Sequence, residues 1–285
     1  MLEREDWEEQ CCCLRKPGPA LHIDEDCVPI PARQVVEDLD KFLETNDVEG
    51  AELHLTEWLK KAREGKDKAG ELTVLNEMMG FFRSIGKEKE GLDSVKEGLS
   101  LLESMDLKES VTAGTTWINA ATTLKAFGRA GEAMPLYERA WRAYNGNLDP
   151  GDYRFAGLSN NMALTCVDMG DYVRAGKYYQ TAMNIMKNLP RGSMEMAVTY
   201  VNLACMYDAW GHRSDLEGEE AAPTDWDRRI WSCLDTAMEY LNDPGAVRDG
   251  YYAFTCSKCA GTFGYFGQFR RKKELETRAK EIYGR

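Results

Sequence analysis

The chain has 285 residues, of which 43% are hydrophobic and 29% charged, a composition typical of folded globular proteins. Its 36 basic and 48 acidic residues give a formal net charge of −12 at pH 7. Such a negative field repels phosphate backbones and anionic lipid surfaces. We therefore expect neither nucleic acid nor a membrane as a partner.

The sequence opens with MLEREDWEEQCCCLRKPG, which alternates charges and lacks the apolar stretch of a signal peptide. No later stretch approaches the roughly 18 consecutive apolar residues that a membrane span needs. The nine cysteines are scattered over a long chain, unlike the dense disulfide framework of a small secreted domain. These features predict a cytoplasmic protein with reduced thiols.

Two segments are expected, an N-terminal extended segment of residues 1–31 and a helical domain of residues 32–285. The stretch RKPGPALHIDEDCVPIPARQ holds four prolines, which favour an extended course until Pro31 opens the first helix. Two interpretations stay open for this leader. It lies in a binding groove as an internal pseudo-ligand, or it covers the apolar face of the first helices.

A regular series of turn residues divides the helical domain. Each ends a predicted helix, and successive members lie 40, 42, 42 and 41 residues apart: Asn46, Gly86, Gly128, Gly170 and Gly211. A last marker, Gly267, follows after 56 residues. Because glycine readily adopts the left-handed backbone that ends helices, this spacing predicts a repeated helix–turn–helix unit.

Small and aromatic residues recur within these units. After Gly128 and again after Gly170, alanine, tyrosine and alanine stand 5, 9 and 12 residues beyond the marker: Ala133, Tyr137, Ala140, Ala175, Tyr179 and Ala182. These offsets share one face of a helix, where alanine lets a neighbouring helix approach closely. Proline and glycine mark the expected links between units, at 147–152, 188–193 and 241–246.

With these residues, segments such as LSNNMALTCVDMGDYVRAGKYYQTAM resemble the tetratricopeptide repeat (TPR) family, whose consensus carries the same series of small, glycine, alanine and aromatic residues. The period near 42 residues is similar to that of the long repeats of kinesin light chains. The resemblance covers residues 32–285 and implies an all-α fold, a right-handed superhelix of about six helix pairs. It also implies a concave groove, lined by the first helix of each pair, that binds a protein or peptide.

The chain departs from the repeat pattern in its outer parts. Gly91 and Gly98 stand where alanine is expected, and the basic tail QFRRKKELETRAKEIYGR predicts a capping helix with a solvated face, with binding of an acidic ligand as the alternative. Residues 212–227, HRSDLEGEEAAPTDWD, are inserted after Gly211, and we expect an acidic loop at a helix turn. This insertion either carries a function or is merely tolerated.

The sequence holds no residue pattern typical of catalysis. The spacings of nucleophile elbows, zinc proteases and phosphate loops are missing, and the three histidines lie far apart: His22, His54 and His212. The glycines of GTFGYFG, residues 261–267, are expected to allow close helix packing rather than to bind phosphate. We therefore expect no enzyme activity and no cofactor.

Two groups of cysteines need separate interpretation. Cys11, Cys12 and Cys13 are adjacent, so they cannot readily all point at one tetrahedral metal. Cys256 and Cys259 lie three apart in an apolar helical stretch and are expected to be buried small side chains rather than a redox pair. No metal site is predicted.

An asparagine recurs nine residues before three successive markers, as Asn119, Asn161 and Asn202. The resemblance implies that asparagine at this position faces the groove and hydrogen-bonds the backbone of an extended peptide, and an amide suits this role because it is both donor and acceptor. The alternative is that these asparagines tie adjacent first helices together. Both roles can coexist.

The predicted peptide-binding groove also includes Asn76 and Asn160, which lie one residue earlier in their repeats. The residues nine positions before Gly86 and Gly267 are not asparagines but Glu77 and Lys258, so the asparagine series ends there.

We therefore predict a scaffold that binds a protein or an extended peptide, with a mild preference for a basic partner because of the negative net charge. The alternative is a ligand-gated regulator that senses a short signalling peptide without its own DNA-binding module, since residues 1–31 are too short and too rich in proline to form one. An enzyme would need a pocket that joins His212 or the cysteines at 11–13 to a charged partner.

Overall fold

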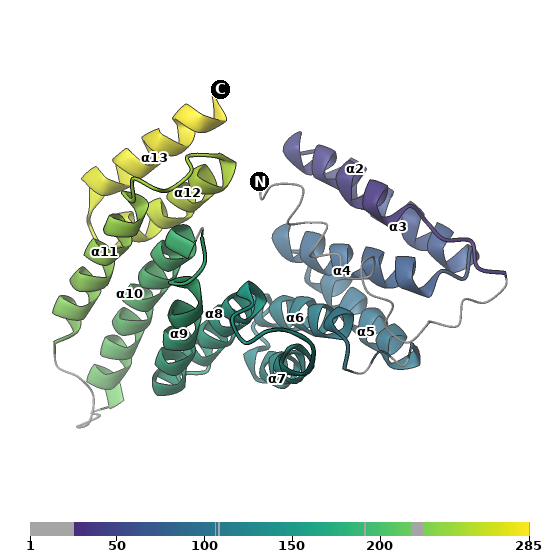
Figure 1. Cartoon of the computed structure of the whole chain (residues 1–285), viewed down its shortest axis with the longest axis horizontal. Coiled ribbons are helices and arrows are strands. Elements are labelled where there is room, and N and C mark those ends of the chain that lie inside the picture. The colour runs from purple at the N-terminus through teal and green to yellow at the C-terminus, as the bar shows by residue number, and fades with distance from the viewer. Residues whose placement is uncertain (1–25, 106, 108, 191, 218–224, 285) are drawn as a thin grey trace. The chain divides into compact units, whose positions relative to one another are not determined.

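The structure is a computed structural model that describes residues 26–284 except 106, 108, 191 and 218–224 (Figure 1). This part of the chain contains twelve α-helices and no strand, and none of these helices is long and apolar enough to cross a membrane. It divides into two compact units, an N-terminal unit ending at Leu148 and a C-terminal unit beginning at Asp149. The expectations for residues 1–25, among them the three adjacent cysteines, lie outside the described residues.

Each unit consists of six helices that pair in chain order. Those of the N-terminal unit are α2 (Ala32–Glu44), α3 (Val48–Glu64), α4 (Lys68–Ser84), α5 (Glu88–Ser104), α6 (Val111–Ala126) and α7 (Ala130–Asn147). Those of the C-terminal unit are α8 (Tyr153–Asp168), α9 (Tyr172–Met186), α10 (Gly192–Glu217), α11 (Trp226–Leu241), α12 (Gly250–Tyr265) and α13 (Phe269–Tyr283). The predicted all-α fold of helix pairs is confirmed.

The pairs stack in the same way within each unit. The first helices contact one another, α2 with α4 and α4 with α6 in one unit, and α8 with α10 and α10 with α12 in the other. Second helices contact the next first helix, as α3 does with α4 and α9 with α10. Successive first helices therefore form a continuous surface within each unit.

Left-handed backbone marks the turns inside the pairs. Four marker glycines have φ between 71° and 76°, namely Gly86, Gly128, Gly170 and Gly267, and Asn46 has φ 56°. Because a side chain with a Cβ atom is strained at such angles, glycine recurs at these positions. The five turns predicted there are confirmed.

The turn predicted at Gly211 is wrong, because α10 runs through this residue as far as Glu217. Gly211 is buried, and a Cβ atom there would lie 3.0 Å from Cγ of Trp226. The Trp226 ring in turn lies 5.3 Å from that of Trp210, which stacks on Tyr172 at 5.6 Å. Gly211 is therefore small to admit an indole ring rather than to bend the backbone, and the first residues of the expected loop at 212–227 are helical.

The alanine and tyrosine face predicted for the second helices is fully buried. All six residues are 0% exposed: Ala133, Tyr137, Ala140, Ala175, Tyr179 and Ala182. The two tyrosines differ in their hydroxyls. The Tyr137 Oη atom lies 2.9 Å from Thr122 Oγ1, whereas the Tyr179 hydroxyl is buried without a hydrogen-bond partner among the described residues. The residue that corresponds to Thr122 in the next repeat is Leu164, which offers no hydroxyl.

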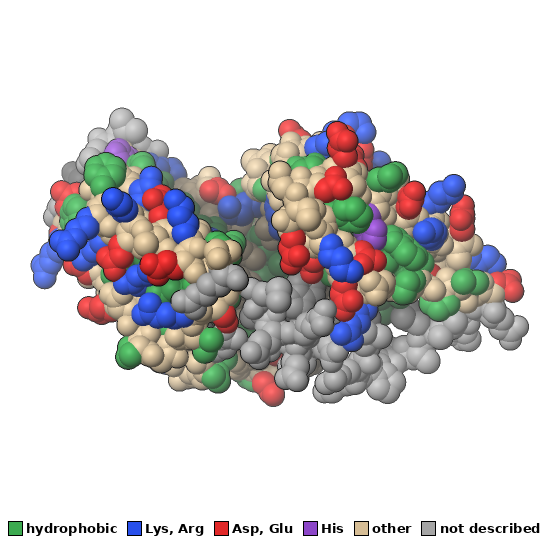
Figure 2. Space-filling model, turned by 90° about the horizontal axis from the view of Figure 1, so that it is seen from above, with side chains coloured by type: hydrophobic (Ala, Val, Ile, Leu, Met, Phe, Trp, Pro, Cys, Tyr) green, Lys and Arg blue, Asp and Glu red, His purple; other side chains and the backbone are tan. Residues whose placement is uncertain are grey.

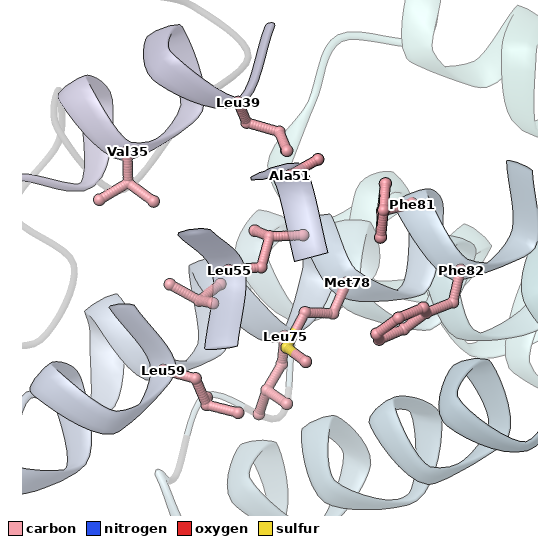
Figure 3. Packing of buried hydrophobic residues seen from close by; sticks show 10 residues of the cluster. Val35, Leu39, Ala51, Leu55, Leu59, Leu75, Met78, Phe81 and Phe82 are labelled. Atoms are coloured by element: carbon pink, nitrogen blue, oxygen red, sulfur yellow. The ribbon is translucent and has the colours of Figure 1, made fainter. Parts of the chain in front are cut away.

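The core of the N-terminal unit joins α2, α3 and α4 (Figure 3). Its buried members are Val35, Leu39, Ala51, Leu55, Leu59, Val74, Leu75, Met78, Phe81 and Phe82. Each large aliphatic or aromatic side chain contributes about 1.5–3 kcal/mol when it is removed from water. This burial holds the first helices in place, so that their opposite faces form a surface of defined geometry.

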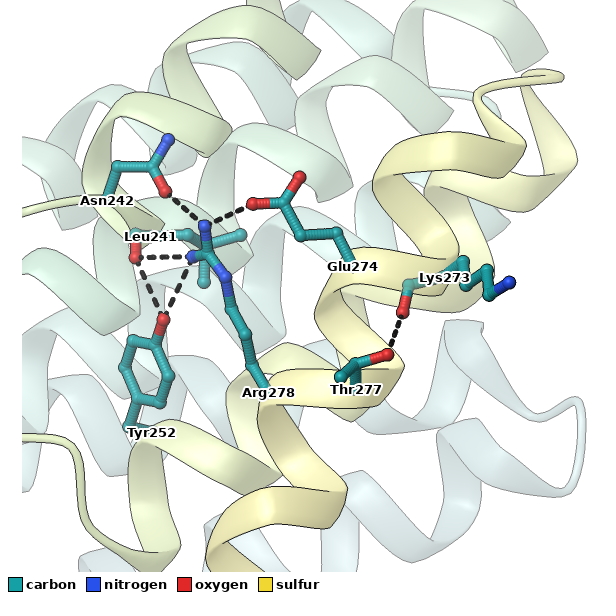
Figure 4. Close-up of polar contacts among 7 residues, drawn as sticks. All are labelled: Leu241, Asn242, Tyr252, Lys273, Glu274, Thr277 and Arg278. Atoms are coloured by element: carbon teal, nitrogen blue, oxygen red, sulfur yellow. Dashed lines mark hydrogen bonds and ion pairs between the residues drawn. The ribbon is translucent and has the colours of Figure 1, made fainter.

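A guanidinium group fastens the last helix of the C-terminal unit (Figure 4). Arg278 of α13 donates to the Leu241 carbonyl oxygen at 3.2 Å, to the Tyr252 hydroxyl at 3.0 Å and to Asn242 Oδ1 at 2.7 Å. It also pairs with Glu274 of its own helix at 2.5 Å. One side chain thus connects α13 to the end of α11 and to α12.

The cysteines of α12 are buried as predicted, since Cys256 and Cys259 are both 0% exposed. Burial raises the pKa of both thiols, that of Cys259 to about 12, so they stay protonated. The expectation of close helix packing holds for Gly264, where a Cβ atom would lie 2.7 Å from Cδ of Lys272. It is wrong for Gly261 and Gly267, which have open space beside them.

Candidate functional site

The residues nine positions before each marker lie on the first helix of each pair. They are Glu37, Glu77 and Asn119 in the N-terminal unit, and Asn161, Asn202 and Lys258 in the C-terminal unit. We call these six residues the row residues. Lys258 is exposed and the other five are half-buried. Side chains of this kind are accessible to a ligand while their helices hold them in place.

In the N-terminal unit, the predicted site residues Asn76 and Asn119 bind each other. Asn119 Nδ2 donates to Asn76 Oδ1 at 3.1 Å, and Asn76 Nδ2 donates to Thr116 Oγ1, also at 3.1 Å. These bonds join α4 to α6. Helix bridging therefore occupies much of the hydrogen-bonding capacity of both amides.

Asn160 has the same bridging role in the C-terminal unit. It is 8% exposed, and its amide exchanges hydrogen bonds with Thr199 Oγ1 of α10 at 3.1–3.2 Å. Asn160 thus faces the neighbouring helix rather than an open surface.

Asn161 and Asn202 differ from these three. Both are half-buried, on the contacting helices α8 and α10, and neither side-chain amide makes a hydrogen bond within the described part of the chain. Half-buried amides without partners can accept and donate to a bound molecule.

Polar contacts between α10 and α12 lie on either side of Asn202 along α10. The hydroxyl of Tyr251 donates to Glu195, and that of Tyr265 donates to Asp208 Oδ2 at 2.9 Å. Burial raises the pKa of Glu195, while the charge of Lys258 opposes this rise. The sequence analysis missed Glu195, Asp208, Tyr251 and Tyr265. Their positions on two successive first helices are the signal that could have identified them.

The exposed thiol of Cys205 lies one helical turn beyond Asn202, on the same surface of α10. Thr262 of α12 lies beside it.

The corresponding surface of the N-terminal unit is acidic. Burial and, to a lesser extent, the neighbouring Asp40 raise the pKa of Glu77 to about 7. Burial together with Glu44 and Glu37 raises the pKa of Asp40. Carboxylates that disfavour one another's ionisation favour the approach of a cation.

The described histidines have separate structural contacts. The Nε2 atom of His54 lies 2.8 Å from the Val35 carbonyl oxygen, inside the first helix pair. The Nδ1 atom of His212 lies 2.8 Å from the Asp208 carbonyl oxygen, and this histidine is exposed beside a surface hollow of about 510 Å³. Among the described residues, no group of three or more His, Cys, Asp or Glu side chains could hold a metal ion.

Comparison with known proteins rests on structure alone. Neither a protein-family model nor a curated protein matches this sequence. The apo form of the quorum sensor NprR from B. thuringiensis is similar, with a TM-score of 0.56 and 13% identity over 88% of this chain and 64% of that one. NprR in complex with its cognate peptide NprX also has a TM-score of 0.56, with 14% identity over 98% of this chain and 74% of that one.

A putative kinesin light chain of Podosopora anserina with nearly identical TPR-like repeats is similar at a TM-score of 0.50, with 14% identity over 74% of this chain and 94% of that one. Identities this low establish a shared fold only. The stacked helix pairs and these similarities together show that the chain has a TPR-like repeat fold.

Proposed function

We propose that the surface formed by the first helices binds an extended segment of a partner protein or peptide, and that the chain is a binding scaffold. The observation that carries this proposal is the pair of half-buried amides, Asn161 and Asn202, at equivalent positions of adjacent first helices and without partners among the described residues. Asn160 fixes α8 to α10 beside these amides, and Asn76 and Asn119 fix α4 to α6 in the separate N-terminal unit.

The spacing of helices suits an extended ligand. Packed helices lie about 8–10 Å apart, and an extended chain advances about 3.3 Å per residue. Equivalent side chains on adjacent first helices therefore meet peptide groups about three residues apart. An amide can pair with either the N–H or the carbonyl of a peptide group, so the contact does not depend on the ligand's sequence.

The structural comparisons support a peptide as the ligand. NprR holds its cognate peptide NprX, so a protein with this fold accommodates a peptide. For this chain, the net charge of −12 favours a ligand with a basic side chain. We infer a cytoplasmic partner of this kind.

The test compares capture of partners from native lysate by the intact chain and by an Asn161→Ala, Asn202→Ala variant. Each lost hydrogen bond costs about 1 kcal/mol, so the double variant is expected to bind about 30-fold more weakly. An Asn145→Ala, Asn188→Ala variant is the matched control, since both of these asparagines are exposed and lie outside the row residues. Equal capture of the same partners by all three proteins would rule out recognition through the amides.

A further inference from the structure

Arg83 of α4 is a half-buried arginine whose guanidinium group has no partner within the described part of the chain. Its side chain makes no hydrogen bond, ion pair or ring contact there, and its Nη1 atom is buried without an acceptor. The other half-buried arginines of the described residues all have a partner: Arg139 lies over the Trp117 ring, and Arg154, Arg174, Arg213, Arg229, Arg271 and Arg278 bind Asp152, Tyr178, the Gly170 carbonyl oxygen, Asp225, Asp235 and Glu274. A buried polar group without a partner calls for an explanation.

The lack of a carboxylate beside Arg83 contrasts with the charge of the chain. Acidic residues outnumber basic ones by 48 to 36, and on the face of the molecule shown in Figure 2 basic and acidic side chains are interspersed. Burial lowers the pKa of Arg83, and the group that opposes this effect is Tyr137 rather than a carboxylate. Burial of a cation without a counter-charge costs free energy. A carboxylate supplied by a ligand would offset this cost.

Arg83 lies on the side of α4 that faces α6. It follows Asn76 by seven residues, or about two helical turns, so the two side chains share one face of the helix. Asn76 binds Asn119 and Thr116, both of α6. Arg83 therefore belongs to the surface that the first helices of the N-terminal unit form together.

Gly80 leaves room beside Arg83 on this surface. It lies on α4 between Asn76 and Arg83, and a Cβ atom at Gly80 would meet no side chain and no neighbouring helix within 4 Å. Its backbone is helical and does not require glycine. The side chain of a ligand can therefore lie against α4 at Gly80 and reach the guanidinium group one turn further along the helix.

We propose that Arg83 binds the carboxylate of an aspartate or glutamate side chain in the partner segment. The inference rests on the proposed function and names one chemical group of its ligand. A guanidinium group can bind a carboxylate through two parallel hydrogen bonds. One cation balances one carboxylate, whereas a phosphate group carries nearly two negative charges and would be repelled by the net charge of −12. The partner segment thus carries an acidic residue at α4 in addition to the basic residues that the net charge favours.

Peptides selected from a random display library on the full chain test this proposal. Each selected peptide that contains an acidic residue is also made with asparagine or glutamine in its place. Both forms are titrated against the intact chain and against an Arg83→Gln variant by calorimetry. We expect either change alone to raise Kd about 10- to 100-fold, because a hydrogen-bonded charge pair is lost. The two changes together are expected to cost no more than one of them, because they remove the same contact.

Arg142→Gln is the matched control, since Arg142 is an exposed arginine of α7 in the same unit. We expect it to leave Kd unchanged. Because Arg83 has no partner within the described part of the chain, Arg83→Gln is expected to keep the urea midpoint of the intact chain. A midpoint that falls further in Arg83→Gln than in Arg142→Gln would show that Arg83 has a structural partner, and would overturn the proposal.

Two binding results would also overturn it. One is a set of selected peptides without acidic residues. The other is a loss of affinity on replacing the acidic residue that is as large in Arg83→Gln as in the intact chain.

The Asn161→Ala, Asn202→Ala variant separates this inference from the proposed function. Peptides whose affinity depends on these amides but not on Arg83 would leave the proposed function in place and refute the carboxylate contact. Peptides whose affinity depends on Arg83 but not on the amides would support the carboxylate contact and rule out recognition through Asn161 and Asn202.

Discussion

Glu77 has a pKa of about 7 in the folded protein and an ordinary value of 4.5 in an unfolded chain. Between pH 4.5 and pH 7, Glu77 keeps its proton in the folded state but has lost it in the unfolded state. The stabilising effect of the protonated carboxyl is therefore complete below pH 4.5 and is lost as the pH rises through 7. The shift corresponds to about 3 kcal/mol of unfolding free energy.

A Glu77→Gln variant keeps an uncharged side chain of the same size at every pH. We expect it to be more stable than the natural chain by up to about 3 kcal/mol at pH 8, and by about 1 kcal/mol or less at pH 5. Urea denaturation at the two pH values measures the difference. Glu103→Gln, at an exposed site of α5, serves as the control. A Glu77→Gln effect of the same size at both pH values would contradict the burial argument.

The two buried tyrosines of the second helices give a paired prediction. Tyr137→Phe removes a hydroxyl that bonds Thr122, and it is expected to lower stability by about 1 kcal/mol. Tyr179→Phe removes a buried hydroxyl without a partner, so it is expected to leave stability unchanged or to raise it by about 1 kcal/mol. The melting temperatures of both variants test this prediction. An equal loss of stability in both would show that the Tyr179 hydroxyl has a hydrogen-bond partner.

At the scale of elements, α10 depends on the fit between Gly211 and Trp226. A methyl group at position 211 would overlap the indole ring, so Gly211→Ala is expected to cost about 1–3 kcal/mol. Gly176→Ala in α9 is the matched control, because that position is helical and has open space around it. There alanine is expected to stabilise by about 0.5–1 kcal/mol. Urea midpoints that fall by the same amount in both variants would contradict this account.

The contrast between Gly211 and the other markers shows which feature of the fold could not be predicted from the sequence. Gly86, Gly128, Gly170 and Gly267 terminate helices through their own left-handed backbone, so the signal is local and readable. Gly211 lies at the same interval, but it is required by a ring fifteen residues further on. A glycine needed for packing and a glycine needed for a turn look alike in the sequence.

The same limit applies to the candidate site. The period placed the asparagines on the first helices, because position within a repeat fixes the face of the helix. Which amides bridge helices was decided by Thr116 and Thr199, each about 40 residues away on the next first helix. Such partners depend on how one repeat packs against another, so they could not be read from either repeat alone.

At the scale of the whole molecule, the repeat period predicted the number of helix pairs and their order. It did not predict that the described chain divides into two compact units at Leu148 and Asp149.

Cys205 is an exposed thiol on the surface of α10, so this surface can be labelled with a thiol reagent without introducing a mutation. It is exposed, whereas the other described cysteines are half-buried or buried: Cys27, Cys166, Cys233, Cys256 and Cys259. Although burial raises the pKa of Cys205, iodoacetamide is expected to alkylate it faster than the four buried cysteines, at a rate that mass spectrometry of individual peptides resolves. A partner lying across Asn202 would shield this thiol, and an unchanged alkylation rate in its presence would place the partner elsewhere.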